Sequence, residues 1–254
     1  MLRRLIFGGA CLLLFFARAA LATHEPAFVD LRRLLAQPEE SIDFALAKLT
    51  IDRLIDSSTD VDAAMREIDR LAKTIESRTP AGLAPRERMD ILLSTLYVPG
   101  PWNDQRPFAY DLDDPLGNDP TAKQLSTYLR TRKGNCVSMP ILVVILGQRL
   151  GLIVTLSTAP EHDLVKFADG HSWLNVEATA GGYKWDSSYE RELGITPLAI
   201  KNEIYLRPHS PRETVGVMAA TLMEDLAAKK RADDLLVVAD MLLAVNPKDV
   251  VAII

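Results

Sequence analysis

The chain has 254 residues and a formal net charge of −5, with 48% hydrophobic and 25% charged residues. This composition is typical of a globular protein and excludes a disordered chain, and the length allows one or two domains. An acidic chain is a poor binder of nucleic acid or of anionic lipid, so we predict neither as a partner.

Residues 1–22 are predicted to be a signal peptide. Arg3 and Arg4 form a positive n-region, residues 5–16 an apolar stretch of twelve, and residues 20–22 an Ala-Leu-Ala cleavage site. Twelve apolar residues are too few to cross a bilayer comfortably, which argues against an uncleaved membrane anchor. We therefore predict export, to the periplasm, with no membrane attachment after cleavage.

Cleavage leaves a single cysteine, Cys136. It removes Cys11 and three arginines, so the mature chain keeps 26 basic against 34 acidic residues, a net charge of −8. A lone cysteine cannot form an internal disulfide, and in an exported protein it indicates an intermolecular bridge or a free reactive thiol. The alternative is a buried cysteine that packs as a small apolar side chain.

The segment over residues 23–120 is predicted to be a helical N-terminal region that ends in a proline-rich loop. Asp60 is the expected N-cap of a helix over 61–77, and a second helix runs from Pro85 towards Leu96. Seven proline and glycine residues follow Val98 and predict a loop. They are Pro99, Gly100, Pro101, Pro107, Pro115, Gly117 and Pro120.

The segment over residues 121–208 is predicted to hold the core. A short helix from Thr121 to about Arg132 precedes an apolar helix that ends near Leu150, with Gly151 as its C-terminal signal. Three strand-like runs follow, at 152–158, 163–167 and 172–178.

The last segment, residues 209–254, is predicted to be helical again. Helices over 211–229 and 232–245 form an antiparallel pair, and the apolar run 250–254 looks like the start of another helix. The expected fold class is α+β, in which a cysteine helix packs on a small antiparallel sheet between helical N-terminal and C-terminal segments.

Cys136 is predicted to lie where the apolar helix begins. A helix N-terminus presents unpaired N–H groups and a partial positive charge, which favour thiolate over thiol. The same N–H groups can hold the oxyanion of a tetrahedral intermediate. Pro140 fits without loss of a hydrogen bond only if the helix starts at Val137 or later. The position suits a nucleophile, and a cysteine packed at a helix end is the alternative.

A hairpin turn at Asp169-Gly170 is predicted to bring a histidine opposite a carboxylate. A two-residue turn there pairs residues whose numbers sum to 339, so His162 is expected directly across from Glu177, about 5 Å away. An imidazole that faces a carboxylate is the base-and-orienter part of a cysteine triad. An ordinary cross-strand contact is the alternative.

A rival arrangement uses His171 and Asp186, which are fifteen residues apart, as His162 and Glu177 are. His171 lies at the predicted turn, about 20 Å along the strand from Glu177 at roughly 3.3 Å per residue. Because both ends of one hairpin cannot face one cysteine, the prediction favours His162.

Several stretches resemble the bacterial transglutaminase-like family, in the short-core branch that is often joined to tetratricopeptide-type helices. They are Gly134-Asn135-Cys136, Arg149-Leu150-Gly151-Leu152 and Pro160-Glu161-His162, followed by Glu177 and Gly181-Gly182. The resemblance covers about residues 85–205 and implies a papain-like fold with acyl chemistry through a thioester. Larger family members place Asp where this chain has Glu177, and His171-Ser172-Trp173 resembles their His-x-Trp.

The sequence thus predicts an exported cysteine hydrolase or acyl transferase that acts on the amide bonds of a peptide or protein substrate. Cys136 is the nucleophile, His162 the general base and acid, and Glu177 the orienter, and no cofactor or metal is predicted. The alternative is a non-catalytic interaction module. In that case the C-terminal helices, which resemble tetratricopeptide repeats weakly, would bind a protein partner.

Overall fold

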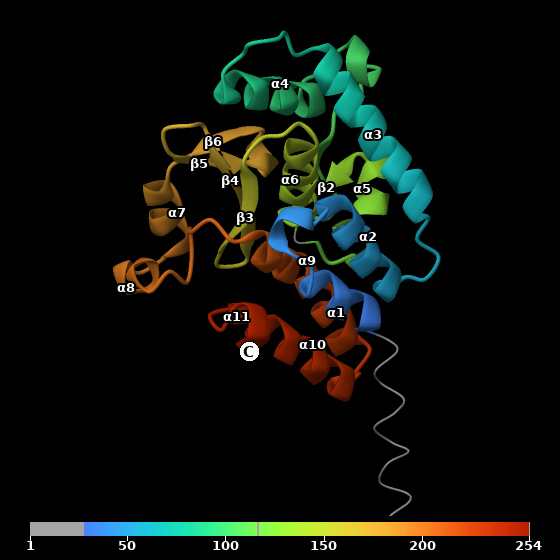
Figure 1. Ribbon diagram of the computed structural model, residues 1–254, viewed down its shortest axis with the longest axis vertical. Helices are drawn as coiled ribbons and strands as arrows, with labels where there is room; N and C mark the ends of the chain where they lie inside the picture. Colours follow the sequence, from blue (N-terminus) through green and yellow to red (C-terminus); the bar gives the residue numbers. More distant parts are fainter. Residues whose placement is uncertain (1–27, 116, 254) are drawn as a thin grey trace, which may run out of the picture.

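The computed structural model describes residues 28–115 and 117–253, so the predicted signal peptide lies outside the described residues. Among the described helices, none combines the length and the apolarity needed to span a bilayer. A four-stranded antiparallel sheet lies between two groups of helices (Figure 1). The fold is therefore the predicted mixture of helices and an antiparallel sheet.

The chain begins with helices that pack against one another, as the sequence predicts. They are α1 (Val29–Leu35), α2 (Phe44–Ile55), α3 (Val61–Ser77) and α4 (Pro85–Tyr97), with a 3-10 turn, η2 (Glu39–Ser41), between the first two. The predicted bounds of α3 are confirmed. Asp60 is its N-cap as predicted, and Asp60 Oδ1 accepts a hydrogen bond from Ala63 N at 2.9 Å. Helix α4 starts at the predicted Pro85, which has no N–H to lose at that position.

The predicted loop after α4 carries a short strand that the sequence pattern misses. Strand β1 (Ala109–Tyr110) pairs in parallel with β2 (Lys133–Gly134), which lies just ahead of Cys136. Between these strands the predicted helix is divided into a 3-10 turn, η4 (Pro120–Lys123), and α5 (Leu125–Thr131). The loop is thereby tied to the segment that carries the cysteine.

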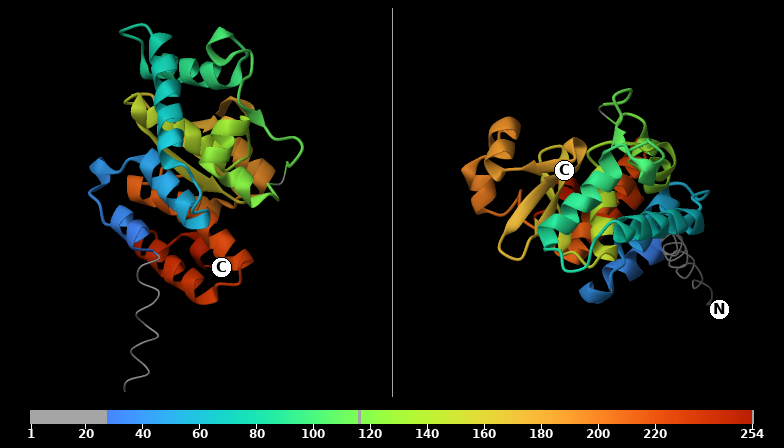
Figure 2. Two further views of the ribbon diagram at one scale, coloured as in Figure 1. Left: turned by 90° about the vertical axis from the view of Figure 1, so that its right-hand side faces the viewer. Right: turned by 90° about the horizontal axis from the view of Figure 1, so that it is seen from above.

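The main sheet has the strand order β3-β4-β5-β6. Its strands are β3 (Val154–Ala159), β4 (His162–Ala168), β5 (Trp173–Glu177) and β6 (Gly182–Lys184). Helix α6 (Ser138–Arg149) packs on one face, where Val165 and Phe167 are fully buried. The other face carries Leu164, which packs with Tyr189 of α7 (Asp186–Leu193). Seen from above, this helix and α8 (Pro197–Lys201) lie on the opposite side of the sheet from α2–α6 (Figure 2).

The segment that leads into the C-terminal helices lies along the edge strand β3 of the sheet. The backbone N–H groups of Leu206 and His209 bond to carbonyl oxygens of Thr158 and Leu156 in β3, and α9 (Pro211–Ala228) follows. Helix α9 packs against α2 and β3, and α10 (Ala232–Val245) and α11 (Val250–Ile253) lie beyond it (Figure 1). Buried side chains of α1–α6, α9–α11 and the main sheet form one cluster, and a second, smaller cluster lies under α7. The predicted divisions of the chain into segments remain predictions.

The register of the hairpin β4–β5 differs from the prediction by two residues. Ala168 pairs with Trp173, so paired numbers sum to 341 and four residues form the turn. Asp169 Oδ1 accepts the backbone N–H groups of His171 and Ser172 at 2.8 Å each, and these bonds hold the longer turn. A shift of two keeps every side chain on its predicted face, whereas a shift of one would have reversed the faces.

Candidate active site

Cys136 lies in the turn just before α6, whose first helical residue is Ser138. The helix therefore starts late enough to place Pro140 in its first turn, where its missing N–H costs nothing. The thiol is partly buried, and Sγ donates to the backbone oxygen of Glu161 at 3.9 Å. Helix α6 is thus aimed at the turn between β3 and β4.

That turn has two residues, Pro160 and Glu161, because Ala159 pairs with His162. Glu161 has a φ of 54°, in the left-handed region that costs an ordinary side chain free energy of about 1 kcal/mol or more. The turn fixes His162 as the first residue of β4, beside the nucleophile.

The approach to the cysteine requires close packing at Gly134. A Cβ at this position would lie 2.5 Å from the ring of Tyr128 and 2.8 Å from Ser138 Oγ, so only glycine fits without a rearrangement. The next residue, Asn135, is 3% exposed and caps the helix with its side chain. Strand β2, Gly134 and Asn135 therefore set the position of Cys136 from its N-terminal side.

The structure brings His162 and Glu177 together, although they are not directly opposite each other. His162 Nε2 and Glu177 Oε2 are 2.8 Å apart. In the observed register paired numbers sum to 341, so position 179 is opposite His162. Glu177 lies two residues from that position, on the same face, and the two side chains meet diagonally. The contact predicted from the sequence is present, but the geometry that produces it is not the predicted one.

The carboxylate of Glu177 is saturated with hydrogen bonds. Oε2 accepts from His162 and from the hydroxyl of the fully buried Tyr189 at 2.8 Å, and Oε1 accepts from the backbone N–H and hydroxyl of Thr179 at 3.2 and 2.6 Å. Burial opposes ionisation, but the hydrogen bond from His162 and its charge outweigh burial and lower the pKa of Glu177 to about 2. Glu177 therefore stays anionic at neutral pH.

The imidazole of His162 lies between this carboxylate and the thiol. Because Nε2 contacts Glu177, Nδ1 is the ring nitrogen left for the hydrogen bond with Cys136. Burial disfavours the charged ring, but the hydrogen bonds with Cys136 and Glu177 dominate and raise the pKa of His162 to about 9. An ordered thiol, imidazole and carboxylate is the arrangement in which cysteine nucleophiles are activated.

The thiol and the imidazole open into a cavity of about 1060 Å³. Its walls come from the loop after α4, the β3–β4 turn, α9 and the segment that enters α11. Residues from these four regions include Tyr110, Asp163, Thr221, Glu224, Lys248 and Val251. The volume matches that of a site for a drug-sized molecule or a peptide side chain.

The rival residues occupy other places. His171 is exposed in the four-residue turn, at the far end of the strand from Cys136. Asp186 Oδ1 accepts hydrogen bonds from Lys166 Nζ at 2.9 Å and from Asn175 Nδ2 at 2.6 Å. It thereby neutralises a lysine that is only 3% exposed. The structure therefore does not bring His171 and Asp186 together with the cysteine.

One expectation about the helix start is wrong. The N–H groups of Val137 and Ser138 donate to Asn135 Oδ1, and that of Met139 donates to the backbone oxygen of Asn135. They are not open to an oxyanion, because the side-chain and backbone oxygens of Asn135 accept them. An Asn before an apolar helix is a preferred N-cap, which is the signal that could have found it.

Tyr110, Thr179 and Tyr189 also belong to the site and carried no sequence signal. The two hydroxyl donors to Glu177 come from η5 (Ala178–Ala180) and α7, and Tyr110 comes from the unpredicted β1. In the described ranges, no group of three or more His, Cys, Asp or Glu side chains is arranged to hold a metal ion.

A family model matches most of the chain. The model of the transglutaminase-like superfamily matches residues 62–220, from α3 into α9 and more than half of the chain. The chain therefore belongs to the transglutaminase-like superfamily. The match is wider than the stretch of resemblance in the sequence, and it contains Cys136, His162 and Glu177. The part of the cavity wall from Thr221 onward lies outside it. Comparisons with curated protein sequences and with solved structures gave no significant match.

Proposed function

We propose that the chain is a cysteine-dependent acyl-transfer enzyme with a papain-like core, and that it cleaves amide bonds of a peptide or protein. The observation that carries this proposal is that Cys136 and His162 line the same large cavity, with Glu177 hydrogen-bonded to His162 Nε2. Superfamily membership alone is compatible with a catalytic or a non-catalytic role. A buried and fully hydrogen-bonded carboxylate behind the histidine supports the catalytic one.

The proposed reaction has two steps. The Cys136 thiolate, stabilised by the charge of the His162 imidazolium, adds to the amide carbonyl carbon. The C–N bond breaks, the leaving amine takes the proton of the imidazolium, and a thioester remains. Neutral His162 then takes a proton from water, and the water oxygen adds to the thioester carbon. The C–S bond breaks, the carboxylic acid leaves, and the thiolate and imidazolium are restored. Glu177 keeps Nε2 of the ring in place and stabilises its charge throughout.

We expect hydrolysis rather than cross-linking, because the cavity is open to water and water competes with any amine acceptor. A protein acceptor would have to enter the same cavity. The presence of an amine in the second step would give a new amide in place of the acid, so the products distinguish the two outcomes.

The experiment follows Cys136 directly and needs no natural substrate. The protein is treated with p-nitrophenyl acetate at pH 7.5, release of nitrophenolate is recorded, and peptide mass mapping locates the acetyl group. We expect a burst of one equivalent, with the acetyl group on Cys136. The matched control is Cys136→Ser, which should show no burst. Wild-type protein without a burst and without acetyl-Cys136 would refute the catalytic proposal and leave the interaction module.

We also propose that the protein is exported, with the mature chain starting after Ala22. The supporting observation is the sequence alone: the n-region, the apolar stretch and the Ala-Leu-Ala site. Intact mass of the protein from its native host, with fractionation of the cells, tests this proposal. Recovery of only the full-length chain, in the membrane fraction, would refute it.

A further inference from the structure

The N–H groups near the thiol can be counted one by one. Asn135 Oδ1 accepts from Val137 N at 3.0 Å and from Ser138 N at 3.1 Å, and its backbone oxygen accepts from Met139 N at 3.1 Å. Pro140 has no N–H. The first N–H groups of α6 are therefore engaged by one residue, and an oxyanion at the thiol needs other donors.

Two donors remain next to Cys136. Within residues 28–115 and 117–253, the backbone N–H of Cys136 makes no hydrogen bond, and Asn135 Nδ2 is buried and has no partner. Asn135 is 3% exposed, yet it lines the same cavity as Cys136 and His162. Buried amide donors in folded proteins are nearly always paired, and an unpaired one costs about 1–3 kcal/mol. Such a donor beside a nucleophile points to an acceptor on the bound molecule.

The hydrogen bonds of Asn135 identify which atom of its side-chain amide is the nitrogen. Three donors bind Asn135 Oδ1, namely Val137 N, Ser138 N and Ser138 Oγ, the last at 3.3 Å. Two backbone N–H groups identify this atom as the oxygen, so Nδ2 must be the other atom of the amide group. Nδ2 lies against Gly117 of the loop, where a Cβ would come within 3.0 Å of it. A residue without a side chain borders the cavity at this point.

We propose that Asn135 Nδ2 and the backbone N–H of Cys136 form the oxyanion hole of the reaction, which makes Asn135 a catalytic residue. When Sγ adds to the carbonyl carbon, the π electron pair of the C=O bond moves onto oxygen, which then accepts both hydrogen bonds. When that pair returns, the C–N bond breaks, and the amine leaves with the proton from His162. This assignment rests on the proposed function, because it needs an acyl substrate.

The test separates a reaction that forms an oxyanion from one that does not. Acylation by p-nitrophenyl acetate passes through a tetrahedral oxyanion, whereas alkylation by iodoacetamide displaces iodide without one. Asn135→Asp keeps an oxygen for the N–H groups of α6 and removes the donor, and Asn135→Ser keeps a capping oxygen without added charge. Asn202→Asp, the same change at an exposed position outside the cavity, is the control.

We expect both Asn135 variants to be acylated about 10²-fold more slowly than wild type. Alkylation of Asn135→Ser should stay within about threefold of wild type, and the control should match wild type in both assays. Asn135→Asp also adds a negative charge near the thiol. The change in its alkylation rate measures the effect of that charge, and its change in acylation rate is divided by that factor. Thermal unfolding shows whether each variant is folded.

Three results would overturn the assignment. Unchanged acylation in both variants would show that other groups hold the oxyanion, and the proposed function would stand. An equal fall of acylation and alkylation in Asn135→Ser would show that Asn135 only caps the helix. Failure of wild-type protein to form acetyl-Cys136 would remove the proposed function and this assignment with it.

Discussion

The structure contains two pairs of histidine and glutamate, and both histidines face the same cavity. The pairs differ in the other hydrogen-bond partners of the glutamate. His162 Nε2 is 2.8 Å from Glu177 Oε2, whereas His209 Nδ1 is 3.8 Å from Glu213 Oε2. Both imidazoles are largely buried, so exposure does not explain the difference.

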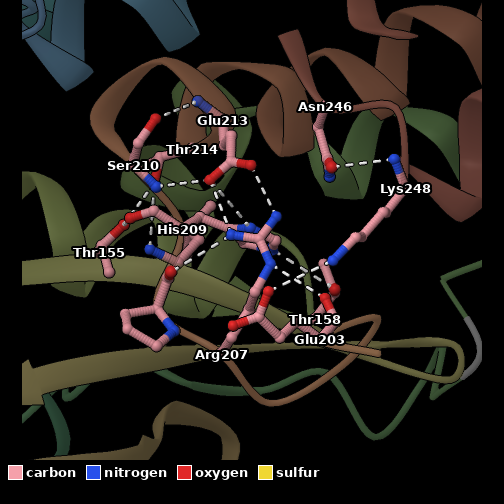
Figure 3. Close-up of polar contacts among 12 residues, drawn as sticks. Thr155, Thr158, Glu203, Arg207, His209, Ser210, Glu213, Thr214, Asn246 and Lys248 are labelled. Atoms are coloured by element: carbon pink, nitrogen blue, oxygen red, sulfur yellow. Dashed lines mark hydrogen bonds and ion pairs between the residues drawn. The ribbon is translucent and has the colours of Figure 1, made fainter. Parts of the chain in front are cut away.

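The glutamates have different partners. Glu213 is bound by Arg207 through two hydrogen bonds of 2.6 and 2.8 Å and accepts the backbone N–H of Ser210 (Figure 3). Burial opposes its ionisation, but the Arg207 guanidinium holds the pKa of Glu213 far below its usual range. Within the described part of the chain, Glu177 contacts no arginine, and its contacts besides His162 are the neutral groups of Thr179 and Tyr189.

The comparison indicates what each carboxylate does. A glutamate already neutralised by arginine fixes the start of α9. There Ser210 and Glu213 form a capping box, and the hydroxyl of Thr214 is hydrogen-bonded to that of Thr155 in β3 (Figure 3). A glutamate that meets only neutral donors keeps its charge for the imidazole. We therefore assign the base to His162 and a structural role to the second pair.

His162→Ala should have the largest effect on the thiol. Loss of the imidazolium removes the positive charge that stabilises a thiolate at Cys136, so alkylation by iodoacetamide at pH 7 should fall by about 10²-fold or more. Rates are measured by mass spectrometry of the Cys136 peptide. An unchanged rate would mean that the contact between Sγ and the ring has no chemical role, and the non-catalytic interpretation would then be favoured.

Glu177→Gln should have a smaller effect, about tenfold in alkylation, because the ring stays in place without its charged partner. Its effect on stability depends on pH. The raised pKa of His162 stabilises the fold fully below pH 6.5, and this contribution is lost as pH rises through about 9. The lowered pKa of Glu177 stabilises the fold above pH 4.5, and this contribution is lost as pH falls through about 2.

The difference in free energy of unfolding between wild type and Glu177→Gln should therefore be largest between pH 4.5 and 6.5 and shrink towards pH 9. Its maximum should be about 1.5–3 kcal/mol, the range for a hydrogen bond to a charged group. Urea unfolding at a series of pH values measures it. A difference that grows between pH 6.5 and 9 would contradict the assignment of these two groups as a charged pair.

Local signals in the sequence were sufficient to predict helices that begin with a capping residue or a proline. Asp60 ahead of α3 and Pro85 at the start of α4 set those ends, because a cap or a proline acts within one turn of the helix. The parity of β4 was also predictable, since side chains alternate whatever the length of the turn. This alternation is the reason why His162 and Glu177 were correctly placed on one face.

Features that depend on distant groups were not predictable in this way. The turn after β4 has four residues because the Asp169 carboxylate accepts two N–H groups, a competition that a two-residue rule ignores. Strands β1 and β2 have two residues each, too few to show alternation, and they pair across more than twenty positions. The cavity walls come from segments over a hundred residues apart, and no local pattern reports such proximity.

His209→Ala should change the thiol little and the stability measurably. Its ring is 5% exposed and lies over the anchor of α9, so truncation leaves a cavity and loses the contact with Thr158. We expect a loss of about 1–2 kcal/mol, which corresponds to a fall in Tm of several degrees for a domain of this size. Alkylation of Cys136 should stay within about threefold of wild type. A fall in the alkylation rate as large as that expected for His162→Ala would mean that His209 and Glu213 take part in the chemistry.

His171→Ala should have the smallest effect of all, because the residue is exposed in the turn and its side chain makes no hydrogen bond among the described residues. Both the alkylation rate and Tm should match wild type. Asp186→Asn is the informative companion, since it leaves the buried Lys166 without its anionic partner. It should lower Tm by several degrees and leave the alkylation rate unchanged. If His171→Ala and Asp186→Asn both abolished alkylation while His162→Ala did not, the base would lie at the tip of the hairpin. That result would require a different packing of β4 and β5 against α6.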